Sequence, residues 1–332
     1  MKEEISIISC SGYGNTGSSV LTDLLSEFTE CYSMTDYEFR FLQDYGGITT
    51  LEDCLVRSPH RLNSDIALKN FEKYVHKKTI FINRNGYEKF FNNKFKKYSN
   101  EYIEELIDVE WNGYWEQYQI ESSLVKEYLY YKIWPRLKKI VSGKILNEVL
   151  PKRKMYYSNP KEKFYIATQK YLNKLFNEIY LKEKLTKIVF DQLIPPNDIL
   201  RYKKYIKNLK VVVIDRDPRD LYIENMEKCK EPWLPKDINK FIKHYKLMRT
   251  GLDNDKECIL RINFEEFIYN YDASIDKIIN FLKLDKNNHE NKKTFFNPEI
   301  SKQNTKLWLK NPKYILEVKK IEIELKEYCY FF

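Results

Sequence analysis

A glycine-rich stretch near the amino terminus constrains the fold of this chain more than any other feature. Residues 5–10 form a short apolar, β-branched run, ISIISC, and residues 20–28 carry apolar side chains at helical spacing. Between them, residues 11–19 have the sequence SGYGNTGSS, with three glycines within six residues. The pattern predicts a strand, a tight turn and a helix.

The predicted turn has the composition of an anion cradle. Glycines let the backbone curl so that successive N–H groups point inward. The following helix adds its free N–H groups and the positive end of its dipole, and Ser18 and Ser19 can cap the helix and offer hydroxyls to the same anion. We therefore predict a site for a phosphate or sulfate group. The alternative is a glycine-rich turn that only links the strand to the helix.

The spacing of this stretch is that of a P-loop. Gly12, Gly17 and Ser19 fit the pattern G-x4-G-K-[ST], but Ser18 stands where the motif has lysine. That lysine normally reaches the β- and γ-phosphates of a nucleoside triphosphate, so its absence argues against an ordinary ATPase or kinase. The formal net charge of +9 suits an anionic ligand, although the lysines are scattered and much of this charge is solvated surface.

Composition excludes several classes of protein. The chain has 332 residues, 43% of them apolar, which suffices for a sizeable core. Its six cysteines form no CxxC pair and it has only four histidines, so we expect reduced cysteines and no metal site. No signal peptide precedes Ile5, no apolar run is long enough to cross a membrane, and no nucleic-acid-binding motif occurs. We expect a soluble cytoplasmic protein without an integral membrane segment or a nucleic-acid partner.

A second strand is predicted over residues 31–35, and the polar segment after it contains Glu38 and Arg40. The carboxyl ends of neighbouring strands share one crevice in a doubly wound sheet, so both side chains are expected beside the glycine-rich turn. A carboxylate in that position can take a proton from an attacking hydroxyl. The alternative is a surface loop with a local Glu–Arg pair.

The middle of the chain has helical patterning. Residues 51–75 fit a helix, and residues 78–83 fit either a strand or the edge of the next helix. Residues 87–185 are rich in Tyr, Lys and Glu. We predict that they form a helical insertion, clearest over residues 122–141 and 161–182.

The insertion is expected to cover the crevice and to select what binds there. It carries Trp111, Trp115 and Trp134 and many tyrosines, which could line a sugar-binding surface. At helical spacing, however, such aromatic side chains more often belong to the core. Pro135 is expected to kink or split its helix.

The sheet pattern resumes at residues 187–192 and again at residues 209–215, LKVVVID. A continuous Val/Ile run predicts a strand buried on both faces. It would deliver Arg216 and Arg219 to the rim of the same crevice, where arginine suits a bidentate grip on a phosphate. The alternative is that Arg216 pairs only with a neighbouring aspartate.

The carboxyl-terminal third continues the alternation, with a helix over residues 237–248, a strand over 258–263 and a helix over 273–284. A basic tail follows, in which Lys302 and Lys306 could fold over a bound nucleotide. The alternative is a flexible basic loop.

Taken together, these segments resemble the sulfotransferases that use PAPS (3′-phosphoadenosine-5′-phosphosulfate), in particular the heparan-type and bacterial carbohydrate members. Residues 15–19, NTGSS, stand where the family has a K/R-S-G-T-T type sequence. Residues 38–42, EFRFL, are similar to its E-x-H-F-F motif. Residues 214–220, IDRDPRD, look like its R-D-P-R-D motif for the 3′-phosphate, and residues 260–267, LRINFEEF, resemble its R-Y-E-D-L segment.

The resemblance implies an α/β fold. This is a three-layer P-loop parallel sheet, like that of nucleoside-triphosphate hydrolases, in one domain over residues 1–332, with the insertion over 87–185 on the acceptor side. It implies PAPS as co-substrate, no metal ion, and a small-molecule or glycan acceptor. Glu38 would be the general base, with Arg40 beside it as a second catalytic residue. The residues implied to bind PAPS are Gly12, Gly14, Asn15, Thr16, Gly17, Ser18, Ser19, Arg216, Asn225, Lys302 and Lys306.

The chain departs from the family at three positions. Asn15 replaces the basic residue of the loop, and Gln192 lies in the segment where heparan-type members have E-K-T-P, so that a lysine is lost. Glu224 occupies the position of a serine eight residues after the arginine, where its charge would repel a 3′-phosphate by about 1–4 kcal/mol. Either Asn225 takes the role of the serine, or the donor differs, or activity is lost.

The sequence thus predicts a sulfotransferase that acts on a hydroxyl of a glycan or another small acceptor. Sulfuryl transfer needs in-line positioning and stabilisation of spread negative charge, and Lys302, Lys306 or Arg219 could replace the missing basic residues. Two alternatives stay open. One is a non-catalytic nucleotide- or anion-binding protein of the same fold, to which the departures point. The other is an atypical P-loop kinase, which would require magnesium.

Overall fold

A five-stranded parallel sheet forms the centre of the molecule in the computed structural model, which describes residues 4–80, 86–113, 125, 128–133, 136, 153–230 and 232–332. The strands are β1 (Ser6–Gly12), β2 (Cys31–Glu38), β5 (Lys187–Asp191), β6 (Leu209–Asp215) and β7 (Ile259–Asn263). Their order across the sheet is β2-β5-β1-β6-β7, and every neighbouring pair is parallel. The predicted parallel α/β sheet is therefore confirmed.

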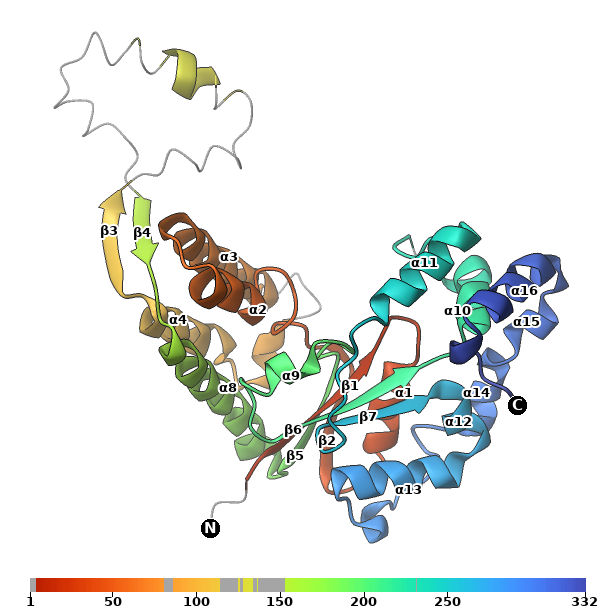
Figure 1. The fold of residues 1–332 in the computed structure, drawn as a ribbon. Helices are drawn as coiled ribbons and strands as arrows, with labels where there is room; N and C mark the ends of the chain where they lie inside the picture. Colours follow the sequence, from red (N-terminus) through yellow and green to blue (C-terminus); the bar gives the residue numbers. More distant parts are fainter. Residues whose placement is uncertain are drawn as a thin grey trace.

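Strand β1 is the central strand, paired with β5 on one side and with β6 on the other (Figure 1). Strands β2 and β5 therefore lie on one side of β1, and β6 and β7 lie on the other. In open α/β sheets, ligands bind at the carboxyl ends of the strands where the winding reverses. The strand order therefore directs attention to the loops that follow β1, β5 and β6.

Each central strand sends alternate side chains into two separate cores. In β6, Val211 and Val213 pack on one face of the sheet, and Val212 and Ile214 pack on the other. All four are at most 1% exposed. The predicted strand buried on both faces is therefore confirmed, and its continuous Val/Ile run is explained by the helices that cover both faces.

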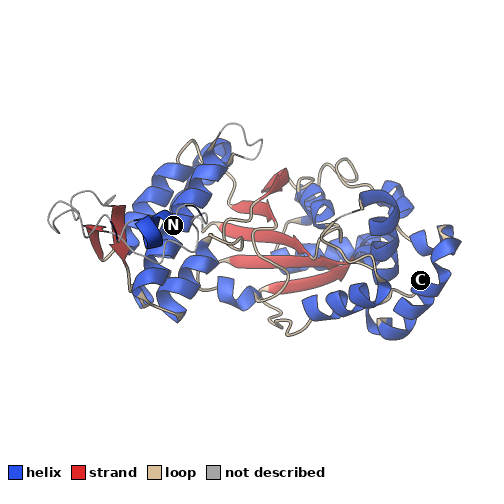
Figure 2. Ribbon diagram, turned by 90° about the horizontal axis from the view of Figure 1, so that it is seen from above, coloured by secondary structure: helices blue, strands red, loops and turns tan. Residues whose placement is uncertain are grey.

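Helices cover the two faces of the sheet unequally (Figures 1 and 2). One face packs against α1 (Ser18–Leu25), α12 (Phe264–Tyr269) and α13 (Tyr271–Leu282). The other face packs against α3 (Arg61–Thr79), α8 (Glu162–Glu183) and smaller elements. The result is a three-layer arrangement of helix, sheet and helix.

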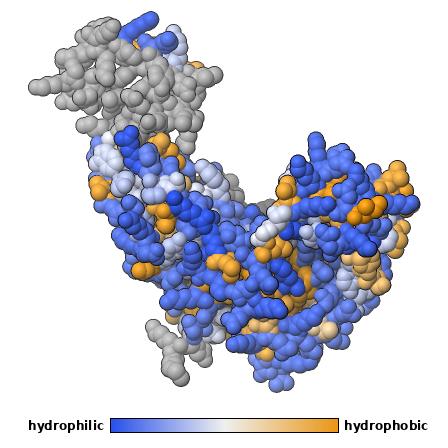
Figure 3. Space-filling view, in the orientation of Figure 1, coloured by the Kyte–Doolittle hydropathy of each residue, from blue (hydrophilic) through white to orange (hydrophobic). Residues whose placement is uncertain are grey.

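A third core lies beyond the carboxyl edge of the sheet. It is formed mainly by α10 (Pro218–Glu224), α11 (Ile238–Met248), α15 (Leu307–Lys310) and α16 (Ile315–Glu324). Figure 3 shows a broad hollow in the surface between these helices and the part of the molecule that contains α3. Within the described residues, the other α-helices are α2 (Ile48–Glu52), α4 (Phe95–Leu106), α9 (Ile199–Tyr202) and α14 (Pro298–Ser301).

The insertion contains a sheet as well as helices, which corrects the purely helical prediction. Strands β3 (Val109–Gly113) and β4 (Arg153–Tyr157) form an antiparallel pair between α4 and α8. The pair is joined to α3 by Tyr156, whose N–H donates to Asp65 Oδ1 at 2.9 Å. The predicted helix over residues 161–182 is confirmed as α8.

The aromatic residues of the insertion divide between core and surface. Tyr102 and Tyr171 are buried and stack on each other with ring centroids 4.8 Å apart. Trp111 on β3 is 39% exposed, so it does not belong to the core. Trp115, Trp134, Pro135 and most of the predicted helix over 122–141 lie outside the described residues; within that range, Leu129–Ile133 form a π-helical turn.

The helix predicted over residues 51–75 is interrupted. Helix α2 runs into a π-helical turn over Asp53–Arg57, and α3 begins only at Arg61. Pro59 explains the break, because a proline disfavours helical backbone at the residue before it. Helix α3 continues to Thr79, so Lys78 and Thr79 are helical rather than extended; residues 81–83 of the predicted strand lie outside the described residues.

Candidate functional site

The glycine-rich turn links β1 to α1 as predicted. The backbone is left-handed at Gly14 (φ 84°), Asn15 (φ 53°) and Gly17 (φ 98°), which reverses the chain between Gly12 and Ser18. Gly17 is the N-cap residue of α1, and no side chain caps the helix. The expectation that Ser18 and Ser19 cap it is therefore wrong. The Val20 N–H donates to the Gly17 carbonyl at 3.1 Å, whereas no hydrogen bond to another described residue takes the N–H groups of Ser18 and Ser19, which stay available to a ligand.

Side chains fill the inside of the turn so closely that two glycines are required. The buried Thr16 Oγ1 accepts the N–H of Tyr13 at 3.1 Å, and a Cβ on Gly12 would lie 2.4 Å from the same oxygen. A Cβ on Gly17 would lie 3.0 Å from the ring of Phe264. The hydroxyl of Thr16 thus holds the turn together from within.

Tyr13 fastens the turn to the end of β6. The Arg249 guanidinium lies 3.9 Å from the centre of the Tyr13 ring and 3.4 Å from that of Tyr245. The same guanidinium forms a two-point ion pair with Asp215, with N–O distances of 2.7 and 2.5 Å. Arg249 was not predicted from the sequence, because nothing local distinguishes it from other helix-terminal arginines.

A cavity of about 610 Å³ opens beside the turn, at the carboxyl edge of the sheet. Its walls come from the turn, the ends of β2 and β5 with the residues that follow them, the segment before α11, and the last residue of α11. The lining residues are Gly12, Tyr13, Gly14, Asn15, Glu38, Arg40, Gln43, Gln192, Pro195, Pro196, Asn197, Trp233 and Met248. The structure thus brings five predicted site residues around one space, and none of the described residues within 87–185 lines it.

Glu38 is the last residue of β2 and pairs in register with Asp191 of β5. The side chain of Glu38 is 57% exposed, and its Oε2 lies 3.8 Å from Nη1 of Arg40. Arg40 is oriented by Asp44, which accepts its Nε–H at 2.9 Å. Glu38 and Arg40 therefore form a local pair, and both residues line the cavity.

A second carboxyl group lies beneath the same wall. Asp191 is 7% exposed, and burial raises its pKa to about 7. The nearby Ser18 hydroxyl acts against burial and lowers this pKa, and the same hydroxyl accepts a hydrogen bond from Gln192 Nε2 at 3.0 Å. Asp191 Oδ1 has no hydrogen-bond partner within the described part of the chain. The position of Asp191 at the end of a predicted strand beside β1 was the sequence clue to it.

Arg216 lies on the other side of the turn, outside the lining of the cavity. It is 5% exposed and donates from Nη1 to the carbonyl of Asn15 at 3.1 Å. Its Nη2 donates to the carbonyl of Asn304, and its Nη1 forms an ion pair with Glu224. Arg216 therefore joins the glycine-rich turn to the carboxyl-terminal tail, and Glu224 neutralises its charge.

The buried side chain of Asn225 follows Glu224 directly. Within the described residues, neither its Oδ1 nor its Nδ2 has a hydrogen-bond partner. Arg219 differs, because it is engaged by Asp217, with N–O distances down to 2.6 Å, and by Glu322 at 2.7 Å. Arg219 thus anchors the carboxyl terminus rather than supplying a charge for the site.

The two tail lysines also have partners. Lys302 Nζ lies 2.7 Å from each carboxylate oxygen of Glu299. Lys306 Nζ lies 3.9 Å from the ring centre of Phe332. The tail itself is held by Asp220, which accepts the N–H groups of Lys306 at 2.8 Å and of Leu307 at 2.6 Å.

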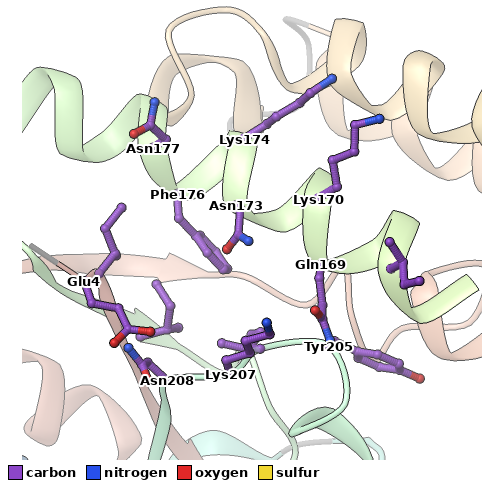
Figure 4. Close-up of a pocket in the computed structure, with 14 residues that line it drawn as sticks. Glu4, Gln169, Lys170, Asn173, Lys174, Phe176, Asn177, Tyr205, Lys207 and Asn208 are labelled. Carbon is purple, nitrogen blue, oxygen red and sulfur yellow. The ribbon is translucent and has the colours of Figure 1, made fainter. Parts of the chain in front are cut away.

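A larger cavity, about 960 Å³, lies at the opposite edge of the sheet, between the start of β1 and α8 (Figure 4). Figure 4 shows Gln169 and Asn173 directed into it, whereas Lys170 and Lys174 turn away. These lysines pair with Glu105 at 2.9 Å and Glu101 at 2.6 Å. The larger cavity is lined by none of the predicted site residues, and it lies at the amino ends of the strands. The cavity of about 610 Å³ is therefore the candidate site.

Comparisons with known proteins add nothing to the choice of the candidate site. No protein-family model matches the chain, and a search of curated proteins finds no relative. Across the ranges that the structure describes, no group of three or more His, Cys, Asp and Glu residues could hold a metal ion. Over the same ranges, none of the helices has both the length and the apolar character needed to span a membrane.

Proposed function

We propose that this protein is a sulfotransferase of the P-loop fold, which moves a sulfuryl group from PAPS to a hydroxyl acceptor with Glu38 as general base. The observation that carries the proposal is that the glycine-rich turn and the Glu38 carboxylate line the same cavity at the carboxyl edge of the sheet. Sulfuryl transfer needs an anion cradle and a proton acceptor on either side of one reacting group.

The sheet order supports the P-loop assignment. The glycine-rich turn follows the central strand β1, and the neighbouring strand β5 ends in Asp191, which lies beside the first residue of α1. In P-loop proteins the loop after the central strand binds phosphates through backbone N–H groups and the helix that follows. The uncapped start of α1 fits this role.

Each residue of the site has a defined task in the proposal. The N–H groups at the start of α1, with Ser18 and Ser19, bind the phosphosulfate. Glu38 takes the proton of the acceptor hydroxyl while the hydroxyl oxygen forms a bond to sulfur. The bond between sulfur and the phosphate oxygen breaks, and the products are a sulfate ester and 3′-phosphoadenosine-5′-phosphate (PAP). The turn stabilises the charge on the departing phosphate.

The structure fits the two ends of PAPS unequally. At the phosphosulfate end, the buried Nδ2 of Asn15 has no hydrogen-bond partner within the described residues, so a donor is free for an anion. At the 3′-phosphate end, Arg216 is already paired with Glu224. A 3′-phosphate has to displace that carboxylate, and Asn225 supplies a neighbouring amide for it. Lys302 and Lys306 join the site only by leaving Glu299 and Phe332.

Calorimetry with PAP tests the proposal. We expect PAP to bind the wild-type protein and Glu38→Gln with the same affinity within about twofold, and only the wild type to transfer radiolabelled sulfate from PAPS. Asn173→Ala, in the cavity at the opposite edge, is the control and should behave as the wild type. Absence of PAP binding contradicts the proposal, and PAP binding without transfer by any form identifies a non-catalytic nucleotide-binding protein.

Asp191 favours a second candidate function, metal-dependent phosphoryl transfer by an atypical P-loop kinase. Mg²⁺ in such enzymes is bound by a hydroxyl from the start of the first helix and by a carboxylate from a neighbouring strand. Asp191 lies beside Ser18, and Ser19, the next residue, occupies the position of that hydroxyl in the motif. This function predicts that ATP binds tightly with Mg²⁺ and weakly with EDTA, and that Asp191→Asn removes the difference. Tighter binding of PAP than of ATP–Mg²⁺ excludes it.

A further inference from the structure

Trp233 forms one wall of the candidate cavity and is unusually exposed for a tryptophan. Its side chain is 45% exposed, and the edge of its six-membered ring rests on Gly14 of the turn. A Cβ on Gly14 would lie 2.5 Å from Cη2 and 2.7 Å from Cζ2 of that ring. The indole is thus fixed at its edge by the turn while much of its surface is open to solvent.

The wall around Trp233 is apolar. Pro195, Pro196 and Met248 line the cavity with it. No aromatic or cationic side chain of the described residues stacks on Trp233, in contrast to Trp308, which lies 4.4 Å from the Arg219 guanidinium. A half-exposed indole without a stacking partner, beside an anion cradle, is available to the apolar face of a ligand.

Other residues that line the cavity supply hydrogen-bond acceptors. Gln43 Nε2 donates to the carbonyl of Gln192, and Gln192 Nε2 donates to Ser18 Oγ at 3.0 Å. Each amide group therefore uses one of its two N–H donors, while no hydrogen bond from the described residues reaches either amide oxygen. Together with the Glu38 carboxylate, these oxygens suit a ligand with several hydroxyl donors. A flat aromatic acceptor would leave them unsatisfied.

The charge of the cavity is balanced. Glu38 and Arg40 are the two charged side chains among its described lining residues, and Arg40 is shared with Asp44. No cation is left over to pair with a carboxylate or sulfate on the ligand. The volume of about 610 Å³ lies within the usual range for small-molecule sites.

We propose that Trp233 is the platform on which a neutral pyranose acceptor stacks, with its hydroxyl groups turned toward Glu38, Gln43 and Gln192. The inference rests on the proposed sulfotransferase function and deepens it by naming the acceptor class and a residue that determines it. One face of a pyranose is apolar because ring C–H groups gather there, and this face meets the indole. The acceptor hydroxyl on the other side is then next to the Glu38 carboxylate.

Saturation-transfer NMR with methyl β-D-galactopyranoside, a neutral sugar with one apolar face, tests the proposal. We expect transfer to the ring C–H groups of that face in the wild type and in Trp233→Phe. Affinity should fall about tenfold in Trp233→Ala, which lacks the aromatic surface. Trp308→Phe is the matched control and should bind as the wild type. Circular dichroism and thermal melting confirm that each variant is folded.

Three results overturn the inference. The first is unchanged sugar binding by folded Trp233→Ala. The second is tighter binding of 2-naphthol, a flat aromatic acceptor, than of the glycoside. The third is equal or tighter binding of methyl β-D-glucuronide, which carries a carboxylate. PAP titration of the same wild-type sample separates this inference from the proposed function: failure to bind PAP contradicts the donor, whereas a lack of sugar binding with PAP binding intact contradicts the acceptor platform.

Discussion

Arg216 and Glu224 form a buried ion pair beside the glycine-rich turn. The side chain of Arg216 is 5% exposed and that of Glu224 is 14% exposed. Arg216 precedes α10 and Glu224 is the last residue of that helix. The helix brings the Glu224 side chain back to Arg216 at the end of β6. An arginine so neutralised attracts a phosphate only if the carboxylate moves aside, so under the proposed function this pair would control how strongly a 3′-phosphate binds.

Glu224→Ser is expected to strengthen PAP binding. Removing a carboxylate at ion-pair distance from Arg216 removes a repulsion of about 1–4 kcal/mol with a 3′-phosphate, which corresponds to a gain in affinity of about fivefold to several hundredfold. Without ligand, the variant should be less stable by about 3 kcal/mol, because the buried charge of Arg216 loses the opposite charge of Glu224. Calorimetry and urea unfolding measure the two effects.

Glu227→Ser is the matched control for this prediction, because Glu227 lies three residues further on and pairs with Lys313 on the surface. It should change neither PAP affinity nor stability appreciably. Equal PAP affinity of wild type and Glu224→Ser would show that Arg216 does not meet the 3′-phosphate.

Gly14→Ala should destabilise the protein more than Gly251→Ala. Both glycines have positive φ, 84° and 63°, so both substitutions strain the backbone by about 1 kcal/mol. Only at Gly14 would the new Cβ meet the Trp233 ring, whereas nothing lies within 4 Å at Gly251. We expect an additional loss of about 1–3 kcal/mol for Gly14→Ala in urea unfolding.

The double variant Gly14→Ala/Trp233→Ala separates strain from contact. If the indole causes the additional loss, removing it should make the cost of Gly14→Ala similar to that of Gly251→Ala. A cost that stays high in the double variant would mean that the turn itself, and not Trp233, requires glycine there.

Asp191→Asn should stabilise the protein at neutral and higher pH. Burial raises the pKa of Asp191 from its ordinary value to about 7. As the pH rises from about 4 to 7, the unfolded chain releases this proton before the folded one does, so the free energy of unfolding falls across that window. Asparagine has no charge to bury. We expect a gain on the order of 2 kcal/mol at about pH 8, vanishing toward about pH 4.

Urea unfolding at several pH values measures this effect, and Asp272→Asn on the exposed surface of α13 is the control, for which we expect no such trend. A stability difference between wild type and Asp191→Asn that does not vary with pH would indicate that the Asp191 carboxyl group is equally ionised in the folded and unfolded chains.

Asp220→Asn should loosen the tail over residues 302–307. Both oxygens of Asp220 accept backbone N–H groups, from Lys306 at 2.8 Å and Leu307 at 2.6 Å. Asparagine offers one oxygen, and its amide group would face the second N–H, at a cost of about 1–3 kcal/mol. Trypsin should then cleave after Lys302 or Lys306 about tenfold faster.

Glu299→Gln is the comparison for the tail. It removes the ion pair of Lys302 but leaves the backbone hydrogen bonds to Asp220 in place. Its rate of cleavage should stay close to that of the wild type. Equal rates for all three proteins would show that the tail is held elsewhere.

The elements that could be predicted are those whose pattern is local. A single period of secondary structure fits the whole length of strand β6 and of the long amphipathic helix α8. The turn between β1 and α1 is marked by its closely spaced glycines. Strand β2 extends further than predicted, to Glu38, because its register shifts against β5 between Met34 and Glu38 and resumes pairing beyond the irregularity.

The elements that were missed depend on partners far apart in the chain. Strand β3 pairs with β4, so that Val109 meets Tyr157. Neither strand shows a clear alternation, because β3 is largely exposed and the buried residues of β4, Met155 and Tyr156, are consecutive. Arg249 acts through Asp215 and Tyr13, which lie in other elements. No short-range pattern marks such residues.

The sequence by itself determined the parallel α/β sheet, the turn that reverses the chain after β1 and the two segments that bring Glu38 and Arg216 to its carboxyl edge. These follow from hydrophobic periodicity and from the backbone freedom of glycine, which act over a few residues. Only the tertiary structure decided which charges remain available there: Glu224 occupies Arg216, Asp217 occupies Arg219, and Asp191 lies buried beside Ser18. Pairing and burial depend on how separate elements pack, and so they were fixed only when the chain folded.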